Sequence, residues 1–340
     1  MSEYLLEVKD LRTSFFTEAG EVKAVDGVSF TLKPGEVLGI VGESGSGKSV
    51  TAYSIMQILQ YPGKVVGGEI LLNGQNLLDL SEKEMRSIRG DKISLIFQDS
   101  MTSLNPVFTV GNQLVEAIRL HTNRTREEAW AHAEKLLSLV GINEPNRRIK
   151  QYPFEFSGGM RQRAMIAMAL ACEPDILIAD EPTTALDVTI QAQILDLIQD
   201  LQKQLGMAVI MITHDLGVIA QICDNIIVMY AGHVCERGVA DDIFYNPKHA
   251  YTRGLLQSIP TEAKTGERLV PISGQPADLL HLPPGCPFAP RCTEAMQICL
   301  DERPEEICLG GNHYASCWLN IRDAISELRA SAAESKGQDQ

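Results

Sequence analysis

The chain has 340 residues, of which 44% are hydrophobic and 22% charged, an ordinary composition for a soluble globular protein with ample material for a buried core. Its formal net charge of −14 argues against nucleic acid or an anionic lipid surface as a partner, because both would repel the molecule as a whole. The acidic N-terminus does not resemble a signal peptide, and no apolar run approaches the roughly 18 residues that a membrane span needs. These features predict a cytoplasmic protein that reaches a membrane only through a partner.

Residues from about 4 to 260 alternate short apolar runs with helix-like stretches, which predicts an α/β domain built on a largely parallel sheet. The pair Asn73-Gly74 follows an apolar run and predicts a β-hairpin, and therefore an antiparallel element beside the parallel sheet. Three apolar runs are the clearest predicted strands: 36–41, 176–179 and 208–212.

The stretch 106–163 is predicted to be a mainly helical subdomain. Within it, 126–140 has apolar residues at helical spacing, and Gly141 follows as a plausible helix end. Residues 261–325 are rich in Pro, Gly and Cys and are predicted to form a small irregular extension. The tail 326–340 is small and polar, which predicts disorder.

The segment 42–49 has the sequence Gly-Glu-Ser-Gly-Ser-Gly-Lys-Ser and fits the phosphate-loop pattern G-x-x-x-x-G-K-[ST]. A predicted strand precedes it and a helix-like segment follows, so a chance glycine-rich turn is a poor explanation. Glycines let the backbone wrap around phosphate, and the helix N-terminus adds favourable charge. Lys48 is predicted to reach the β- and γ-phosphates, and the Ser49 hydroxyl to bind Mg²⁺. The predicted nucleotide-binding residues of this loop are Gly42, Ser44, Gly45, Ser46, Gly47, Lys48 and Ser49.

The predicted strand 176–179 ends in Asp180-Glu181. Carboxylates at the C-terminal end of a parallel strand lie where such sheets bind ligands. Asp180 is predicted to support the Mg²⁺ shell, and Glu181 to orient or deprotonate the water that attacks the γ-phosphate. Such a pair alone is more often a solvated turn, but the phosphate loop favours the catalytic interpretation.

The chain resembles the ABC ATPases, because further motifs occur in the same order along the chain as in that family. The resemblance covers nearly the whole chain. Gln98 resembles the Q-loop glutamine, and Phe-Ser-Gly-Gly-Met at 156–160 resembles the ABC signature. Ala-Leu-Asp at 185–187 resembles the D-loop, and His214 resembles the switch histidine. The resemblance implies a P-loop NTPase fold of the ABC type, with a mixed sheet core, an antiparallel edge subdomain and a helical subdomain.

In this family two such domains pair head to tail, and each ATP lies between one phosphate loop and the other signature. The resemblance therefore implies that Ser157, Gly158 and Gly159 contact the ATP of the partner. The signature departs from the commonest form, Leu-Ser-Gly-Gly-Gln, at Phe156 and Met160. These two differences bear on how strongly this signature binds the ATP held by the phosphate loop of the partner.

The resemblance also implies that His214 bridges the γ-phosphate and the neighbouring subunit. It implies that Gln98 senses Mg²⁺ and the attacking water and relays the state of the site to the membrane subunit. Phe15 matches the upstream aromatic residue that stacks on adenine, with its neighbour Phe16 as the alternative.

Two segments, 99–106 and 246–252, are similar to the ATPases of oligopeptide and dipeptide importers, the subunit usually called D. Ser100 and Ala250 stand where proline is common in those proteins. The resemblance implies import of di- or oligopeptides, and relatives with this layout also import nickel or glutathione. It implies as partners a second, similar but distinct ATPase chain, two transmembrane permease subunits and an extracellular or periplasmic peptide-binding protein. The chain would then lie at the cytoplasmic side of the cell membrane as a peripheral subunit.

The extension carries cysteines in the spacing C-x5-C-x6-C-x17-C, which is wider than the C-x2-C of zinc ribbons. Cytosolic cysteines are reduced, and four thiolates suit an iron–sulfur cluster. The resemblance implies a [4Fe-4S] cluster in some members of the family. Zinc, or a small irregular subdomain without metal, are the alternatives. The candidate ligands are Cys286, Cys292, Cys299 and Cys317.

Three other functions compete with import. A soluble ABC ATPase of DNA repair or translation usually has two ATPase modules, coiled coils or basic surfaces, whereas this chain has one module and is acidic. A regulator that binds ATP without hydrolysing it would not need Glu181 and His214. An exporter motor would not explain the C-terminal extension.

Overall fold

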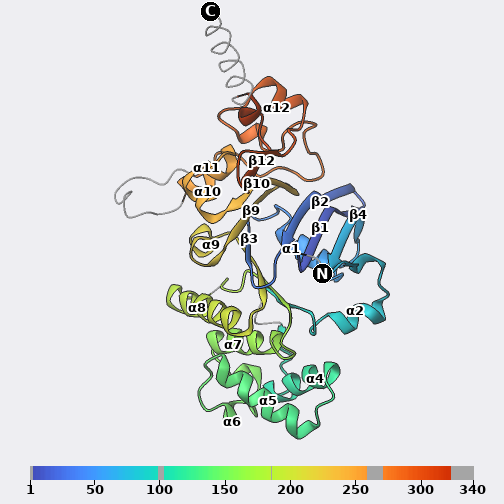
Figure 1. Cartoon of the computed structure of the whole chain (residues 1–340), viewed down its shortest axis with the longest axis vertical. Helices are drawn as coiled ribbons and strands as arrows, with labels where there is room; N and C mark the ends of the chain where they lie inside the picture. Colours follow the sequence, from blue (N-terminus) through green and yellow to red (C-terminus); the bar gives the residue numbers. More distant parts are fainter. Residues whose placement is uncertain (1–2, 99–102, 185, 259–270, 323–340) are drawn as a thin grey trace, which may run out of the picture.

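The computed structural model describes residues 3–98, 103–184, 186–258 and 271–322. In these residues the strands form two sheets, and helices cover the larger one (Figure 1). The strands are β1 Leu6–Thr17, β2 Gly20–Leu32, β3 Val37–Val41, β4 Gly63–Leu72, β5 Gln75–Asn76, β6 Ile93–Ile96, β7 Ile176–Asp180, β8 Ala208–Thr213, β9 Asn225–Tyr230, β10 His233–Val239, β11 Ile307–Cys308 and β12 Tyr314–Ala315.

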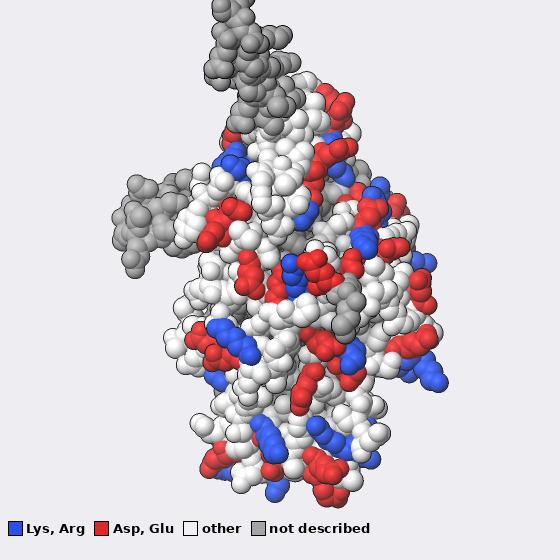
Figure 2. Space-filling view, viewed as in Figure 1, with Lys and Arg blue, Asp and Glu red and all other residues white. Residues whose placement is uncertain are grey.

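The helices alternate with these strands through most of the chain. They are α1 Lys48–Ile55, α2 Glu82–Ile88, α4 Val110–His121, α5 Arg126–Leu139, α6 Pro145–Arg148, α7 Gly158–Ala169, α8 Val188–Leu205, α9 Leu216–Ile222, α10 Ala240–Tyr245, α11 Ala250–Gln257 and α12 Gln297–Asp301, with short 3₁₀ turns η1 Leu77–Asp79, η2 Pro153–Glu155 and η4 Ala289–Arg291. No described helix has the length and apolar character that a membrane crossing requires. Figure 2 shows acidic and basic side chains interspersed over the face in view.

The larger sheet has the strand order β11-β12-β10-β9-β3-β8-β7-β6. Its centre is parallel, since β3 pairs in parallel with β8 and β9, and β7 pairs in parallel with β6 and β8. Every residue of β3, β7 and β8 is buried, as expected where helices cover both faces of a parallel sheet. The carboxyl ends of these three strands meet at one edge, so the loops that follow them lie close together. The expectation of an α/β fold with a parallel core is confirmed.

The smaller sheet is antiparallel and has the order β2-β1-β4-β5. The predicted hairpin joins β4 to β5, with Leu72 opposite Gln75. Its two turn residues, Asn73 and Gly74, have φ values of 48° and 83°, and positive φ at both central positions is the mark of a type I′ turn. The Asn-Gly pair therefore makes the turn that the sequence predicts.

Helices α4 to α7 gather at one end of the molecule (Figure 1). Helix α5 starts at a capping box, in which Thr125 and Glu128 satisfy each other's backbone N–H groups. Its apolar face is buried, and Gly141 follows with φ 74°, as the sequence predicts. The predicted helical stretch 106–163 contains α4 to α6 and the start of α7, which continues to Ala169.

The C-terminal extension joins the larger sheet, because β12 pairs with the edge strand β10. Glu236 of β10 is fully buried at this joint. Its carboxylate accepts hydrogen bonds from the backbone N–H groups of Lys248 (2.7 Å) and His249 (2.9 Å) and from His313 Nε2 (2.7 Å). One side chain thus connects β10, the start of α11 and the extension. The predicted domain boundary near residue 260 and the tail 326–340 lie outside the described residues.

Candidate functional site

The phosphate loop leaves the buried end of β3 and enters α1. A Cβ atom on Gly42 would lie 2.2 Å from the carbonyl oxygen of Met229, so no other residue fits there. Gly47 has φ 101°, and a Cβ on it would lie 2.4 Å from the carbonyl oxygen of Ala24. The glycines therefore let the loop close tightly against neighbouring backbone.

Lys48 lies at the start of α1 with its side chain folded back over the loop. Its Nζ donates to the carbonyl oxygens of Gly42 (2.7 Å) and Glu43 (3.0 Å). Burial lowers the pKa of Lys48, while the nearby carboxylates of Glu181 and Asp180 act in the opposite direction. The ammonium group is thus placed between the loop and the acidic end of β7, where a γ-phosphate would meet it.

The next pair, Ser49 and Asp180, offers oxygen atoms that could hold a magnesium ion. Ser49 Oγ donates to Asp180 Oδ1 at 2.8 Å. The other oxygen, Asp180 Oδ2, is buried and has no hydrogen-bond partner in the part of the chain that the structure describes. A cation can satisfy a buried acceptor of this kind, and a hydroxyl with a carboxylate is a ligand set that Mg²⁺ accepts. Burial raises the pKa of Asp180, and the hydroxyls of Ser49 and Tyr53 beside it oppose that rise.

Glu181 is the centre of the polar network at this edge of the sheet. Its Oε1 lies 3.0 Å from His214 Nδ1, and its Oε2 accepts from Gln98 Nε2 and Thr184 Oγ1, both at 2.8 Å. Three residues predicted from separate motifs, Gln98, Glu181 and His214, are therefore brought together. Glu181 has φ 48°, a left-handed conformation that is rare for this residue type and that concentrates at functional sites.

The hydrogen bonds at Glu181 also fix its charge. Burial alone would raise its pKa, but the hydrogen bonds from His214 and Thr184 outweigh that effect and lower the pKa below its ordinary value of 4.5. Glu181 is therefore ionised at neutral pH and can orient a water molecule or accept its proton.

Two residues of this site are missed by the motif analysis. Tyr53 lies one helical turn after Ser49, and burial together with the charge of Asp180 raises the pKa of Tyr53 to about 12. Helical spacing from Ser49 could have indicated it, since residues i and i+4 share a helix face. Thr184 holds Glu181 from three residues further on, and nothing in the sequence separates it from an ordinary turn residue.

The signature lies on a different part of the molecule from the phosphate loop, at the start of α7 (Figure 1). Ser157 is the N-cap of α7, and its hydroxyl accepts from the backbone N–H of Met160 at 3.3 Å. Phe156 is buried and anchors the turn, whereas Ser157 and Gly158 are exposed. The structure does not bring the signature to this chain's own Lys48, and it leaves the signature open to a second molecule.

Phe15, the predicted adenine platform, lies on β1 and is half-buried. Its ring lies against Gly63 of β4, where a Cβ would come within 2.7 Å of Phe15 Cε1. Its neighbour Phe16 is 48% exposed. Ala185 of the predicted D-loop and residues 99–102 after Gln98 lie outside the described residues.

The four predicted cysteine ligands line one small cavity of about 20 Å³ in the extension. Burial raises the pKa of Cys286 to about 11 and also raises the pKa values of Cys292 and Cys317. As the side chains are placed, no three His, Cys, Asp or Glu residues of the described chain form a group that could hold a metal ion. The four cysteines therefore lie around one cavity, but the ligand geometry of an iron–sulfur or zinc site is not formed.

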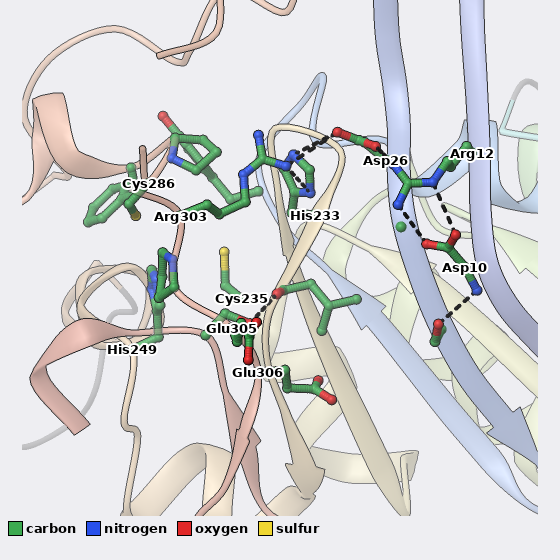
Figure 3. Close-up of a pocket in the computed structure, with 18 residues that line it drawn as sticks. Asp10, Arg12, Asp26, His233, Cys235, His249, Cys286, Arg303, Glu305 and Glu306 are labelled. Carbon is green, nitrogen blue, oxygen red and sulfur yellow. Dashed lines mark hydrogen bonds and ion pairs between the residues drawn. The ribbon is translucent and has the colours of Figure 1, made fainter. Parts of the chain in front are cut away.

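A larger cavity of about 470 Å³ is lined by residues of the extension, the antiparallel sheet and β10 (Figure 3). Arg303 of the extension donates to Asp26 Oδ2 (3.3 Å) and to His233 Nδ1 (3.4 Å). Arg12 pairs with Asp26 and, at 2.8 Å, with Asp10. Burial lowers the pKa of His233 to about 4, so this histidine is neutral and accepts from Arg303. The network connects the extension to the antiparallel sheet.

Comparison with known proteins places the chain in a family. Residues 25–184 match the family described as "ABC transporter", and residues 235–299 match the family described as "Oligopeptide/dipeptide transporter, C-terminal region". The dipeptide transport ATP-binding protein DppD of Bacillus subtilis is 55% identical over 95% of this chain and 96% of its own length. The oligopeptide transport ATP-binding protein OppD of Salmonella typhimurium is 53% identical over 94% of this chain and 95% of its own length.

A solved structure of an ATP-binding cassette has the same fold as this chain. The dimeric ATP-binding cassette MJ0796, in a post-hydrolysis state with ADP and Pi, superposes with a TM-score of 0.63. It is 30% identical to this chain, covering 69% of it and 98% of the cassette. The chain therefore belongs to the ATP-binding subunits of ABC transporters, within the oligopeptide/dipeptide family, and like that family it is an ATPase.

Proposed function

We propose that this subunit hydrolyses ATP at the cytoplasmic side of a membrane transporter and thereby energises the import of di- or oligopeptides. The convergence of Lys48, Glu181 and His214 at one edge of the sheet is the observation that carries the proposal. The names of the relatives, which transport dipeptides and oligopeptides, support the cargo class. The same motor importing nickel or glutathione is the alternative.

The proposed ATP site uses the phosphate loop, Lys48 and the Ser49–Asp180 pair. Backbone N–H groups of the loop bind the phosphates, and Lys48 neutralises the γ-phosphate charge. Ser49 and Asp180, with the Gln98 side chain nearby, would hold Mg²⁺, which would neutralise charge between the β- and γ-phosphates. Phe15 would stack on adenine.

Glu181 is the proposed base or orienting group for the attacking water. Three neighbours fix its carboxylate, which limits the conformational freedom that Glu181 would lose when it directs one oxygen at the attacking water. His214, which is hydrogen-bonded to Glu181, would bridge to the γ-phosphate. Gln98 contacts the same carboxylate and begins the segment that leads toward the helical subdomain.

A second ATPase subunit would complete each ATP site. The exposed Ser157 and Gly158, at the N-terminus of α7, suit contact with the γ-phosphate held by another chain. The solved cassette MJ0796 is dimeric, which supports pairing of two such domains. We propose that the second subunit is similar but distinct, and that ATP closes the pair and hydrolysis reopens it.

Two transmembrane permease subunits and an external peptide-binding protein would complete the transporter, which makes this chain a peripheral membrane subunit. An exposed apolar patch suits permease docking: Val107, Phe108, Tyr152 and Phe154. The two segments that carry these residues are joined, because the backbone N–H of Val110 donates to the carbonyl oxygen of Gln151 at 2.9 Å. Val107 and Phe108 follow Gln98 closely in the chain, which supports a route from the ATP site to the membrane.

We propose in addition that Cys286, Cys292, Cys299 and Cys317 hold a [4Fe-4S] cluster with a structural role. Their convergence on one apolar cavity supports this, and the thiols must shift to reach a common ligand. Protein purified under argon should contain iron and sulfide and absorb broadly near roughly 400 nm. Cys292→Ser should lose both signals, whereas Cys172→Ser, outside the extension, should keep them. Zinc in place of iron, or no metal, contradicts the proposal.

Affinity purification from the native membrane tests the transport function. Two multispanning proteins, a second ATPase and a peptide-binding protein should co-purify, and uptake of a labelled dipeptide should disappear in a Lys48→Ala strain. Recovery with ribosomal or DNA-repair proteins instead would contradict transport while leaving the ATPase chemistry intact. Uptake of nickel or glutathione in place of peptide would favour the alternative cargo.

A further inference from the structure

The C-terminal extension contacts the phosphate loop directly through Glu43. The Glu43 carboxylate accepts two hydrogen bonds from Arg291 of the extension, one from Nη1 (2.5 Å) and one from Nη2 (3.1 Å). The Glu43 backbone N–H donates to Tyr251 Oη of α11 at 2.8 Å. Its carbonyl oxygen accepts from Lys48 Nζ. Two of the three groups that fix this loop residue thus come from more than 200 positions later in the chain.

Arg291 is itself held rigidly. Only 4% of its side-chain surface is exposed. Its Nε donates to the carbonyl oxygen of Ser273 (2.9 Å), its Nη2 also reaches the carbonyl of Ile272 (3.4 Å), and its Nη1 reaches Tyr230 Oη (3.4 Å). The hydrogen bond with Glu43 raises the pKa of Arg291 above its ordinary value, so the guanidinium is charged. A fork of donors fixed in this way can hold a carboxylate in one orientation.

The backbone anchor of Glu43 is equally rigid. Tyr251 is fully buried, and its ring lies 4.7 Å from that of Tyr230 and 5.3 Å from that of Phe288, measured between ring centroids. Tyr230 and Phe288 also contact each other edge-on at 5.3 Å. This aromatic cluster supports both Tyr251 and Arg291, so the loop rests on one preorganised surface made by α11 and the extension.

We propose that Arg291 is a positioning residue of the ATP site, through which the C-terminal extension sets the affinity of the phosphate loop for ATP. Arg291 acts in two ways. It fixes the Glu43 peptide, whose carbonyl holds Lys48, and so keeps the loop in its binding shape. It also neutralises the Glu43 carboxylate, which would otherwise stand unpaired beside the loop and repel a triphosphate.

A second ion pair between the core and the extension offers a matched control. Arg237 of β10 donates to Glu306 with Nε (2.8 Å) and Nη2 (2.7 Å), a bidentate pair that also joins the core to the extension. Neither residue contacts the phosphate loop in the hydrogen bonds of the described chain. If Arg291 only attached the extension, loss of Arg237 would have a comparable effect on ATP binding.

The test is equilibrium binding of ATP, ADP and adenosine to the purified full chain. Arg291→Gln should weaken ATP binding about 10-fold, ADP binding less, and adenosine binding not at all, because the unpaired Glu43 acts on phosphate charge. Arg237→Gln should bind ATP within about 2-fold of wild type, since no charge changes at the loop. Arg291→Gln combined with Glu43→Gln should recover most of the lost affinity, because the unpaired charge is removed.

Three results would overturn the proposal. They are wild-type ATP affinity in folded Arg291→Gln, an equal loss in Arg237→Gln, or a double variant as weak as Arg291→Gln alone. Urea unfolding of each variant confirms that it is folded. If Arg291→Gln does not fold, Arg291→Lys keeps the charge but not the bidentate geometry. Arg291→Lys should then weaken ATP about 3-fold with adenosine unchanged, and wild-type ATP affinity in it would equally overturn the proposal.

Discussion

Glu181 shows how one side chain can be held ready for chemistry by its surroundings. Its backbone has φ 48°, and its two carboxylate oxygens accept or share three hydrogen bonds from three different segments. Such strain persists only where the surrounding structure determines the conformation. Because the same hydrogen bonds lower its pKa, the carboxylate stays ionised as pH falls toward 4.5, its ordinary value.

Replacement of Glu181 by Gln should therefore remove turnover and leave ATP binding intact. The amide keeps the shape but cannot accept a proton or orient water as a charged group does, so kcat should fall roughly 10²- to 10⁴-fold. The measurement is single-turnover ATP hydrolysis alongside equilibrium ATP binding. Glu173→Gln is a matched control, since Glu173 also has a positive φ of 54° but is exposed. Wild-type turnover in Glu181→Gln would remove Glu181 from its role.

The adjacent aromatic residues Phe15 and Phe16 allow a second test at this scale. Stacking of adenine on an aromatic ring is worth roughly 1–3 kcal/mol, so loss of the correct ring should weaken ATP binding about 10-fold. Phe15→Ala should show this loss for adenine nucleotides, and Phe16→Ala should not. The comparison of ATP with inorganic triphosphate, which has no base, separates stacking from a general disturbance of β1. A loss confined to Phe16→Ala would assign the platform to Phe16.

At the scale of elements, the sequence predicted features that depend on neighbouring residues. The β4–β5 turn follows from Asn73-Gly74, and the end of α5 follows from Gly141, because these residues act through local backbone geometry. Short apolar runs in the sequence also predict β3, β7 and β8. Because the carboxyl ends of parallel strands meet at one edge, the sequence predicts that the motifs at the ends of these strands lie close together.

The contacts that the sequence did not predict join segments far apart in the chain. Arg291 meets Glu43 across 248 positions, and β12 extends the sheet by pairing with β10. No local pattern encodes such partners, since an arginine and a glutamate are each ordinary surface residues until the fold brings them together. For the same reason, the four cysteines of the extension could be named as candidate ligands from the sequence, but the positions of their thiols could not be predicted.

The joint between β10, α11 and the extension should make stability depend on pH. His249 caps α11, with its Nδ1 accepting from the backbone N–H of Tyr251, and burial lowers its pKa to about 4 from 6.5. Between these values the unfolded chain binds a proton that the folded chain does not. The free energy of unfolding should therefore fall by at most about 3 kcal/mol as pH drops from 6.5 to about 4.

His249→Asn isolates this effect, because asparagine keeps the helix cap and does not titrate. Urea unfolding between pH 7 and about 4.5 should show a shallower loss of stability in His249→Asn than in wild type. The slope should not vanish, since His233, whose pKa is also lowered to about 4, titrates in the same window. His281→Asn, whose side chain is 75% exposed, should behave as wild type. Equal slopes in His249→Asn and wild type would contradict the prediction.

At the scale of the whole molecule, the ATP site and the apolar patch lie on different parts of the chain. Transport would therefore require that ATP hydrolysis at one site changes the structure at the other. The phosphate loop rests on the C-terminal half through Tyr251 and Arg291, whereas Gln98 leads away from Glu181 toward the helical subdomain. If a permease docks on the patch as proposed, we expect hydrolysis to act on it through movement of the helical subdomain relative to the sheet edge. Such a motion would be a two-state domain change driven by differences in nucleotide contacts.

The patch should then be needed for coupling but not for hydrolysis itself. A few hot-spot residues at the centre of an interface each contribute about 2 kcal/mol or more to binding. If the two phenylalanines are such residues, Phe108→Ser with Phe154→Ser should reduce permease affinity by roughly 30-fold or more. ATP turnover of the isolated subunit should stay within about 2-fold of wild type, because neither phenylalanine contacts the ATP site. Co-purification with permeases and peptide uptake measure the loss. Leu120→Ser, in the same subdomain and 73% exposed, should leave both unchanged. Normal uptake by the double variant would mean that the permease docks elsewhere, and the exposed patch would then need another partner.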